Sequence, residues 1–258
     1  VENKDIGSSI GYKTKGLVKF YKETNNKEEL VEILKYLSNK KIRTIGFGGG
    51  SNLLIKGFFD GAFVHYSNDG IEVVNEDNKN VVIKCGSGLS KERLVGYCCE
   101  HGYSGLEFWA GIPGLVGGGL AMNCGAYNSE TKDVVYKIEL CSPSGVSTVE
   151  AKDMSWSYRS SGIKEGLVIS SVYFKLEKKE ASLVAKTSEE YISDRKKKHP
   201  LEYPSCGSVF KNPDNCSKGS WELIKDAGLC GHRIGGAMIS DKHSNFIINV
   251  GNASHEDI

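Results

Sequence analysis

The sequence predicts a fold of mixed helices and strands that is divided into two or three lobes. The first observation is length, because the chain has 258 residues and domains commonly hold about 100 to 200. The second is patterning, since some segments repeat apolar residues at helical spacing and others are short and β-rich. The third is two glycine-rich segments that separate these patterns, because glycine disfavours both helix and strand.

The composition excludes several functional classes. Lys and Arg number 33 while Asp and Glu number 32, so no general field would hold a nucleic-acid backbone or an anionic membrane surface. No stretch approaches the about 18 to 20 apolar residues of a membrane span, and no signal-peptide layout opens the chain. None of the eight cysteines has C-x-x-C spacing, which favours buried thiols over a metal site. We expect a cytoplasmic protein without metal, nucleic-acid or membrane partners.

The first half of the chain predicts two helices among short strands. Residues 25–40 carry Leu30, Leu34 and Leu37 at helical spacing after an Asn cap, the pattern of an amphipathic helix. A second helix is predicted from Ser90 to His101, where Gly102 would end it. Strands or strand-like runs are predicted at 41–45, 53–55, 62–66, 71–74 and 81–84.

The second half predicts a hairpin, a long charged helix and a further unit. The turn Pro143-Ser144-Gly145 separates two β-rich runs. A helix is predicted from Lys178 through Lys198, and another from Ser220 to its stop at Gly228. Strands are predicted at 134–141, 146–150, 166–176, 207–211 and 246–250.

The loop at 46–52 is the first candidate for a ligand site. It fails the dinucleotide pattern G-x-G-x-x-G, because Ser51 takes the third glycine position and residues 53–55 look like a strand rather than a helix. Four glycines in the five positions 46–50 expose backbone N–H groups to a bulky anion. The run indicates a pyrophosphate cradle, although a tight turn alone would also explain it.

The segment 111–127 is the second candidate. Six glycines occupy the fifteen positions 111–125, and such a stretch makes a poor helix or strand. It indicates a need for exposed, close backbone, such as lying along a flat cofactor.

Several ordered motifs together resemble the UDP-N-acetylenolpyruvoylglucosamine reductase family over about residues 24–257. The resemblance implies an α+β fold, with a two-lobed FAD-binding domain of the vanillyl-alcohol-oxidase type at 1–67 and 68–177 and a C-terminal α+β substrate-binding domain at 178–258. The motifs are Gly48-Gly49-Gly50-Ser51-Asn52-Leu53-Leu54, 111–127, Tyr158-Arg159, Gly207-Ser208-Val209-Phe210-Lys211-Asn212-Pro213 and 227–247.

The resemblance implies NADPH-dependent, FAD-mediated reduction of UDP-N-acetylglucosamine enolpyruvate to UDP-N-acetylmuramate, a step of peptidoglycan precursor synthesis. NADPH would reduce the non-covalently bound flavin in the same cleft before this nucleotide sugar enters. The implied cofactor-binding residues are Gly48, Gly49, Gly50, Ser51, Asn52, Ile112, Pro113, Gly114, Gly117, Gly118, Asn123 and Gly125.

Two catalytic residues follow from the same resemblance. Arg159 would stabilise the enolate that forms beside the substrate carboxylate, since a permanent planar cation suits that task, and Ser208 would donate the proton. These two residues lie only 49 positions apart, which resembles the branch without an inserted loop over the substrate. The implied substrate-binding residues are Tyr158, Arg195, Lys198, Lys211 and Asn212, although cations at 195 and 198 also complement a helix dipole.

The C-terminal residues carry a further expectation. Ser254 and Asp257 have the spacing of a capping box, so a helix is expected to follow. The family places a catalytic Glu in a strand beyond that helix. That strand would lie past Ile258, so no Glu of this sequence is assigned the role.

Two alternatives remain open from the sequence. One is a flavin oxidase or dehydrogenase of the same FAD fold, in which His65, His101 or Cys124 are the candidates for a covalent flavin bond. The other is a non-catalytic relative that binds flavin or a nucleotide sugar.

Overall fold

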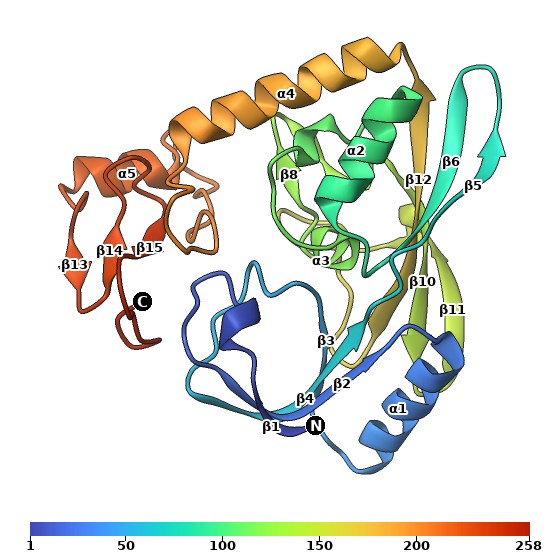
Figure 1. The fold of residues 1–258 in the computed structure, drawn as a ribbon, viewed down its shortest axis with the longest axis horizontal. Coiled ribbons are helices and arrows are strands. Elements are labelled where there is room, and N and C mark those ends of the chain that lie inside the picture. The colour runs from blue at the N-terminus through green and yellow to red at the C-terminus, as the bar shows by residue number, and fades with distance from the viewer. The chain divides into compact units, whose positions relative to one another are not determined.

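The computed structural model describes residues 1–258 (Figure 1). Its chain divides into two compact units, which are described one at a time. Unit 1 comprises Val1, Phe20–Gly49 and Gly61–Ser193, and unit 2 comprises Glu2–Lys19, Gly50–Asp60 and Asp194–Ile258.

The regular elements are mixed throughout the chain. The helices are α1 (Lys27–Asn39), α2 (Lys91–His101), α3 (Val116–Ala121), α4 (Ala181–Lys198) and α5 (Ser220–Asp226), with 3-10 turns at Gly7–Ser9, Glu107–Trp109, Thr131–Asp133 and Ala151–Asp153. The strands are β1 (Glu2–Asp5), β2 (Leu17–Thr24), β3 (Thr44–Phe47), β4 (Phe58–Tyr66), β5 (Ile71–Glu76), β6 (Asn80–Gly86), β7 (Tyr103–Ser104), β8 (Gly125–Ala126), β9 (Ser129–Glu130), β10 (Val135–Ser142), β11 (Gly145–Glu150), β12 (Val168–Lys178), β13 (Arg233–Ile234), β14 (Ala237–Ile239) and β15 (Ile247–Asn249).

Unit 1 is built on an antiparallel sheet with the strand order β11-β10-β12-β6-β5, and β7 also pairs with β12. The central strand β12 pairs with β6 from Ser171↔Gly86 to Glu177↔Asn80. Its residues 168–174 are all buried, because neighbours cover both faces. The strand was predicted at 166–176, and its near-continuous apolar run is typical of a strand buried on both sides.

The larger core of unit 1 lies between this sheet and the segment that contains α2 and α3 (Figure 1). Trp109 is fully buried there and meets the Phe174 ring edge-to-face at a centroid distance of 5.6 Å. Ser90 caps α2 by accepting a hydrogen bond from the Arg93 N–H, and Gly102 ends it in a left-handed conformation. Both predicted ends of this helix are therefore confirmed.

The smaller core of unit 1 lies under α1. Leu30, Leu34 and Leu37 are buried along one side of this helix, as their spacing predicted. They pack with Ala62, Val64 and Tyr66 of β4, Cys141 of β10 and Val168 of β12. The Asn26 side chain accepts a hydrogen bond from the Glu29 N–H at 2.8 Å, which confirms the predicted cap.

Strand β3 delivers the first glycine loop. It pairs in parallel with β4, from Thr44↔Ala62 to Phe47↔His65, and the loop begins directly after Phe47. The strand starts three residues later than predicted, because Lys41 has a φ of 54° and belongs to the turn that follows α1.

Unit 2 contains the small antiparallel sheet β13-β14-β15 and α5. Gly228 has a φ of 71° just beyond α5, as expected for a helix stop. Ser254 and Asp257 form the reciprocal capping-box hydrogen bonds, at 2.9 Å and 3.2 Å. The predicted strand at 246–250 corresponds to β15.

Three secondary-structure predictions were wrong. Residues 53–55 form a loop, in which Ile55 is buried while Leu54 is 40% exposed. Residues 207–211 form only an isolated bridge between Ser208 and Phe246, because Gly207 has a φ of 78° that interrupts an extended run. The second glycine segment contains the short helix α3. Strands β1, β2, β7, β8, β9, β13 and β14 were not predicted.

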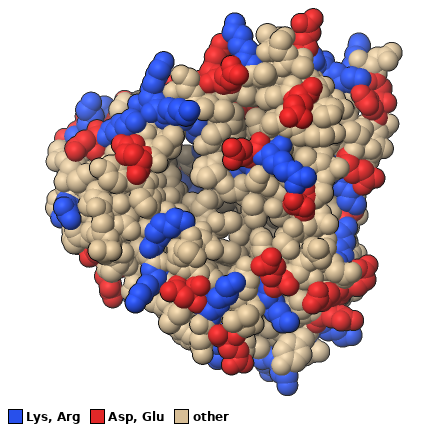
Figure 2. Space-filling view, in the orientation of Figure 1, with Lys and Arg blue, Asp and Glu red and all other residues tan.

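No helix of the structure is both long and apolar enough to cross a membrane. Acidic and basic side chains are interspersed over the face seen in Figure 2, as the near-zero net charge of +1 leads one to expect.

A partly buried charge cluster ties α1 to the sheet of unit 1. The Glu139 carboxylate of β10 accepts hydrogen bonds from Lys27 of α1 and from the Tyr173 hydroxyl at 2.6 Å, and it pairs with Lys84 of β6 at 3.1 Å. Burial alone would raise the pKa of Glu139, but the bonds from Lys27, Tyr173 and Lys84 outweigh it and hold the pKa at about 2.

Replacing Glu139 by Gln should lower the free energy of unfolding at pH 7 by about 1 to 2 kcal/mol, because two ammonium groups lose their carboxylate. Since the folded pKa lies below the unfolded value, this stabilisation is present above about pH 4.3 and is lost as the pH falls toward 2. The difference between variant and parent in urea unfolding should therefore shrink across that window.

The matched control is Glu165→Gln, which removes the exposed partner of Arg43. That pair is exposed to solvent, so its loss should cost less than loss of the Glu139 cluster. If both variants lost the same free energy of unfolding, the Glu139 cluster would contribute no more than an exposed ion pair, contrary to this prediction.

Candidate active site

Within unit 1 the two glycine segments lie with backbone facing backbone. A Cβ built on Gly48 would lie 3.8 Å from Gly118 Cα, and one built on Gly49 would lie 3.6 Å from Gly114 Cα. A Cβ on Gly118 itself would meet no atom within 4 Å. The first segment leaves β3 and the second enters α3, so the sheet and the helix fix the two walls.

The second segment also packs tightly on its other side. A Cβ on Gly117 would lie 2.8 Å from Ser87 Cβ, and one on Gly119 would lie 3.0 Å from the Trp109 ring. Larger side chains would push α3 away from the core. The glycines predicted an irregular segment, but residues 116–121 form the short helix α3. Glycine lowers helix propensity, yet here it lets the helix pack closely on Ser87 and Trp109, and over so few residues the packing outweighs the low propensity.

The remaining residues of the first loop belong to unit 2. Gly50 has a φ of 69°, and a Cβ there would approach Ser9 O to 2.3 Å. The Gly11 N–H donates to Gly50 O at 3.0 Å. Gly50 therefore fixes the turn of the loop, and Ser51 and Asn52 follow it as partly exposed and exposed residues.

Asn123 links the glycine segment to the Tyr158-Arg159 turn in unit 1. Its side chain is fully buried and donates to the Ser157 carbonyl at 3.1 Å and to Glu130 at 3.2 Å. Its side-chain oxygen accepts from the Lys132 N–H at 3.1 Å. These bonds occupy the whole amide, so Asn123 holds Glu130 and the turn after Ser157 in place. The glycine-rich sequence around Asn123 did not indicate these contacts.

Arg159 lies at the tip of a tight turn. Ser157 and Ser160 exchange backbone hydrogen bonds at 2.9 Å and 3.1 Å, and Arg159 has a φ of 62° between them. Its Nη2 donates to Gly125 O at 3.0 Å, while the guanidinium carbon lies 4.9 Å from the Tyr158 ring centroid. The structure thus brings Gly125, Tyr158 and Arg159 together beside the glycine segment.

Glu130 is a member of this site that no sequence motif indicated. It pairs with Lys132 at 2.6 Å. The hydrogen bond from Lys132 lowers the pKa of Glu130 most, and the bond from Asn123 and the nearby Arg159 charge act in the same direction. Glu130 therefore stays ionised, and its negative charge lies near the positive charges of Lys132 and Arg159.

Unit 2 carries Ser208 on the segment beside β15. Its side chain is exposed, and the segment is held to β15 and the residues before it by backbone bonds. Lys211 and Asn212 follow in the same exposed loop. Asn212 Oδ1 accepts from the Ser220 N–H at 3.0 Å and so caps α5.

The cations near the end of α4 differ in their surroundings. Arg195 is buried at 9% exposure, whereas the Lys198 side chain is 64% exposed and pairs with Asp194 at 2.8 Å. Lys198 can therefore reorient toward an anion at the small cost of a surface ion pair.

The three candidates for covalent flavin attachment lie in unit 1. His65 Nδ1 is 2.9 Å from Phe47 O, and His101 Nδ1 is 2.9 Å from Tyr97 O. Cys124 Sγ lies 4.0 Å from the buried Lys91 Nζ.

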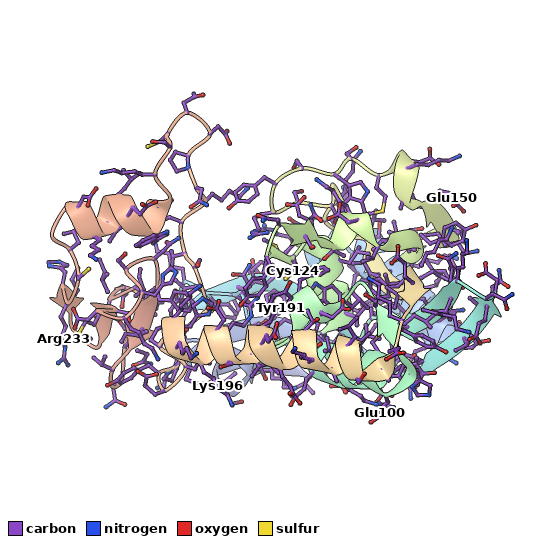
Figure 3. The ribbon with its side chains drawn as sticks, turned by 90° about the horizontal axis from the view of Figure 1, so that it is seen from above. Glu100, Cys124, Glu150, Tyr191, Lys196 and Arg233 are labelled. Carbon is purple, nitrogen blue, oxygen red and sulfur yellow. The ribbon has the colours of Figure 1, made fainter.

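A stacked pair of tyrosines joins α4 to the hairpin of β8 and β9. Tyr191 projects from α4 toward the segment that carries Cys124 (Figure 3). Its ring stacks on Tyr127 at a centroid distance of 3.8 Å, and the Tyr127 hydroxyl donates to Tyr191 O at 3.2 Å. The end of β8 is therefore fixed by α4.

These residues fit a flavin. The facing backbones at 48–49 and 114–118 allow the close approach to main-chain atoms that a flat ring and a pyrophosphate need. In the same unit Arg159 supplies a cation on a turn tied to that backbone. No group of His, Cys, Asp and Glu side chains has the geometry of a metal site.

Comparison with known proteins agrees with this geometry. Residues 18–149 match the FAD binding domain family, and residues 199–258 match the C-terminal domain of UDP-N-acetylenolpyruvoylglucosamine reductase. The reductase of Caldanaerobacter subterraneus subsp. tengcongensis is 38% identical over 237 residues, which are 90% of this chain and 76% of the relative. That of Listeria welshimeri is 37% identical over 99% of this chain and 85% of the relative.

A solved structure agrees over nearly the whole chain. The crystal structure of UDP-N-acetylenolpyruvylglucosamine reductase from Thermus caldophilus superposes with a TM-score of 0.81 at 27% identity, and covers 98% of this chain and 90% of that one. The fold predicted from the motifs, an α+β protein with an FAD-binding domain of the vanillyl-alcohol-oxidase type, is confirmed. The chain belongs to the UDP-N-acetylenolpyruvoylglucosamine reductase family of FAD-dependent oxidoreductases.

Proposed function

We propose that this chain reduces UDP-N-acetylglucosamine enolpyruvate to UDP-N-acetylmuramate, a peptidoglycan precursor, with non-covalent FAD as cofactor and NADPH as electron donor. The observation that carries the proposal is a glycine backbone cradle joined through Asn123 to the turn that presents Arg159. When bound, FAD would supply the redox chemistry, the transfer of a hydride from NADPH to one alkene carbon of the enol ether.

Arg159 is the proposed stabiliser of the charge that results. After hydride addition, negative charge develops at the other alkene carbon and spreads into the adjoining carboxylate. A guanidinium is permanently charged and planar, so it can pair with both oxygens of that group. The Arg159 bond to Gly125 O, at 3.0 Å, orients the guanidinium before substrate arrives, and pre-orientation is what makes such a charge effective.

Ser208 is the proposed proton donor to that second carbon. A hydroxyl is a weak acid, so it must be held within hydrogen-bond reach of the carbon and must act while the enolate is stabilised. Its exposed side chain on a segment bridged to Phe246 supports this role.

We assign the remaining roles by the same proposal. Residues 1–67 and 68–177 would hold FAD, in keeping with the family match at 18–149, and residues 178–258 would hold the nucleotide sugar. Tyr158 would contact the substrate, and the cofactor would lie along the segment that includes Ile112 and Pro113. The cations and polar groups for the sugar and diphosphate would be Arg195, Lys198, Lys211 and Asn212.

We place the reaction in the cytoplasm, with no nucleic-acid or membrane partner. All eight cysteines are free thiols, a state that reducing compartments maintain. NADPH and nucleotide sugars are also kept there as soluble substrates.

Replacing Arg159 by Ala should slow substrate-dependent reoxidation of the reduced flavin by about 10²-fold or more, the scale of losing one electrostatic stabiliser. FAD should stay bound and NADPH should still bleach it. Stopped-flow absorbance separates the two half-reactions. Arg93→Ala, which removes an exposed arginine paired with Asp69, is the control, and parent-like reoxidation in Arg159→Ala would refute the role.

Replacing Ser208 by Ala should leave bleaching by NADPH unchanged and slow reoxidation by substrate by about 10²-fold, the scale of losing a positioned proton donor. Ser217→Ala in the same exposed loop region is the control. Loss of the NADPH half-reaction in Ser208→Ala would mean that Ser208 serves a different step.

A further inference from the structure

The segment that carries Ser208 runs antiparallel to the strand region 245–249 in unit 2. The Asn249 N–H donates to Pro204 O at 2.9 Å, Ser208 bridges to Phe246, and the Val209 N–H donates to Asn245 O at 2.9 Å. Gly207, with its φ of 78°, breaks the ladder between these contacts. Backbone pairing alone therefore holds Ser208 at few points.

The side chain of Asn245 adds the next rung. Its Oδ1 accepts from the Phe210 N–H at 2.9 Å, and its Nδ2 donates to the Phe210 carbonyl at 2.9 Å. One amide thus satisfies both backbone groups of a single residue, as a neighbouring strand would. Asn245 is 5% exposed while the Phe210 side chain is 55% exposed, so the bonds come from the protein interior to a surface segment.

Asn245 is itself held rigidly. Its N–H donates to His243 Nδ1 at 3.3 Å. The His243 ring packs edge-to-face on Phe246 at 4.8 Å, and the His199 ring lies 4.9 Å from the same Phe246. Burial lowers the pKa of His243 and so favours the neutral ring. The turn that carries Asn245 is therefore packed against an aromatic cluster.

We propose that Asn245 is a positioning residue for proton donation by Ser208. By fixing Phe210, it fixes the backbone two residues beyond Ser208, on the side opposite the interruption at Gly207. The inference rests on the proposed function, because it gives Asn245 no role apart from Ser208. A buried amide that lost this pairing would leave polar groups unsatisfied, so the segment and the side chain hold each other in one geometry.

The test compares Asn245→Ala with Asn249→Ala. Asn249 is a matched control because it is also a buried asparagine of the same region. Its side chain instead bonds to Tyr12 O, Gly251 N and Ala253 N. Stopped-flow absorbance of the full chain with FAD measures bleaching by NADPH and reoxidation by UDP-N-acetylglucosamine enolpyruvate separately.

We expect Asn245→Ala to bleach like the parent and to reoxidise about 10- to 100-fold more slowly, since displacement of about 1 Å can cost 10²-fold. Asn249→Ala should reoxidise within about threefold of the parent. If Asn245→Ala does not fold, Asn245→Asp keeps the acceptor for Phe210 N–H, loses the donor and should show a smaller loss in the same half-reaction. Parent-like reoxidation in the folded Asn245 variant would overturn the proposal.

The double variant Ser208→Ala/Asn245→Ala decides whether Asn245 acts through Ser208. It should reoxidise no more slowly than Ser208→Ala alone, because a positioning residue has nothing left to position. A further loss equal to that of Asn245→Ala alone would show independent action and overturn the inference. If Ser208→Ala itself reoxidises like the parent, the proposed function fails at Ser208. Slow Ser208→Ala with fast Asn245→Ala would refute only the role of Asn245.

Discussion

The close approach of the backbone at 48–49 to the backbone at 114–118 is the constraint on which the site of unit 1 depends. Side chains at Gly48 or Gly49 would occupy the space between the two segments. Strand β3 delivers one segment and α3 the other, and α3 can lie where it does only because Gly117 and Gly119 press against Ser87 and Trp109. The feature of this site that suits a flat cofactor is therefore its accessible main chain.

Partly buried hydrogen bonds connect that backbone to the turn that carries Arg159. Asn123 binds the Ser157 carbonyl and Glu130 from within the core, and the turn that follows carries the partly exposed Arg159. In unit 2 the buried Asn245 holds the exposed segment of Ser208 in a comparable way. In both units an interior amide fixes a surface segment that carries a proposed catalytic side chain.

The sequence predicted the elements whose signals are local. Helix α1 was found from its leucine spacing and its Asn26 cap, and α2 from Ser90 and Gly102, because caps and periodicity are properties of neighbouring residues. The glycine segments were recognised as sites for close backbone approach. Their partners in space were not, because nothing in the residues near Gly48 specifies that Gly118 faces it.

The two wrong strand predictions have different causes. Residues 53–55 are apolar but form a loop, because tertiary context decides strand formation. Residues 207–211 make only an isolated bridge to Phe246, because the positive φ of Gly207 interrupts the extended run. Helix α3 has poor propensity and forms because its glycines allow it to pack. The positioning roles of Asn123, Glu130 and Asn245 could not be predicted, because each depends on contacts across the fold, such as the pair between Asn245 and Phe210.

The central claim is that this fold uses one flavin for two successive half-reactions, and an anaerobic visible spectrum tests it most directly. The spectrum of the FAD-loaded chain would be recorded alone, after NADPH, and after UDP-N-acetylglucosamine enolpyruvate. We expect the flavin band at about 450 nm to disappear with NADPH and to return with substrate. A band that disappears and does not return with substrate, or a chain that binds no FAD, would contradict the claim.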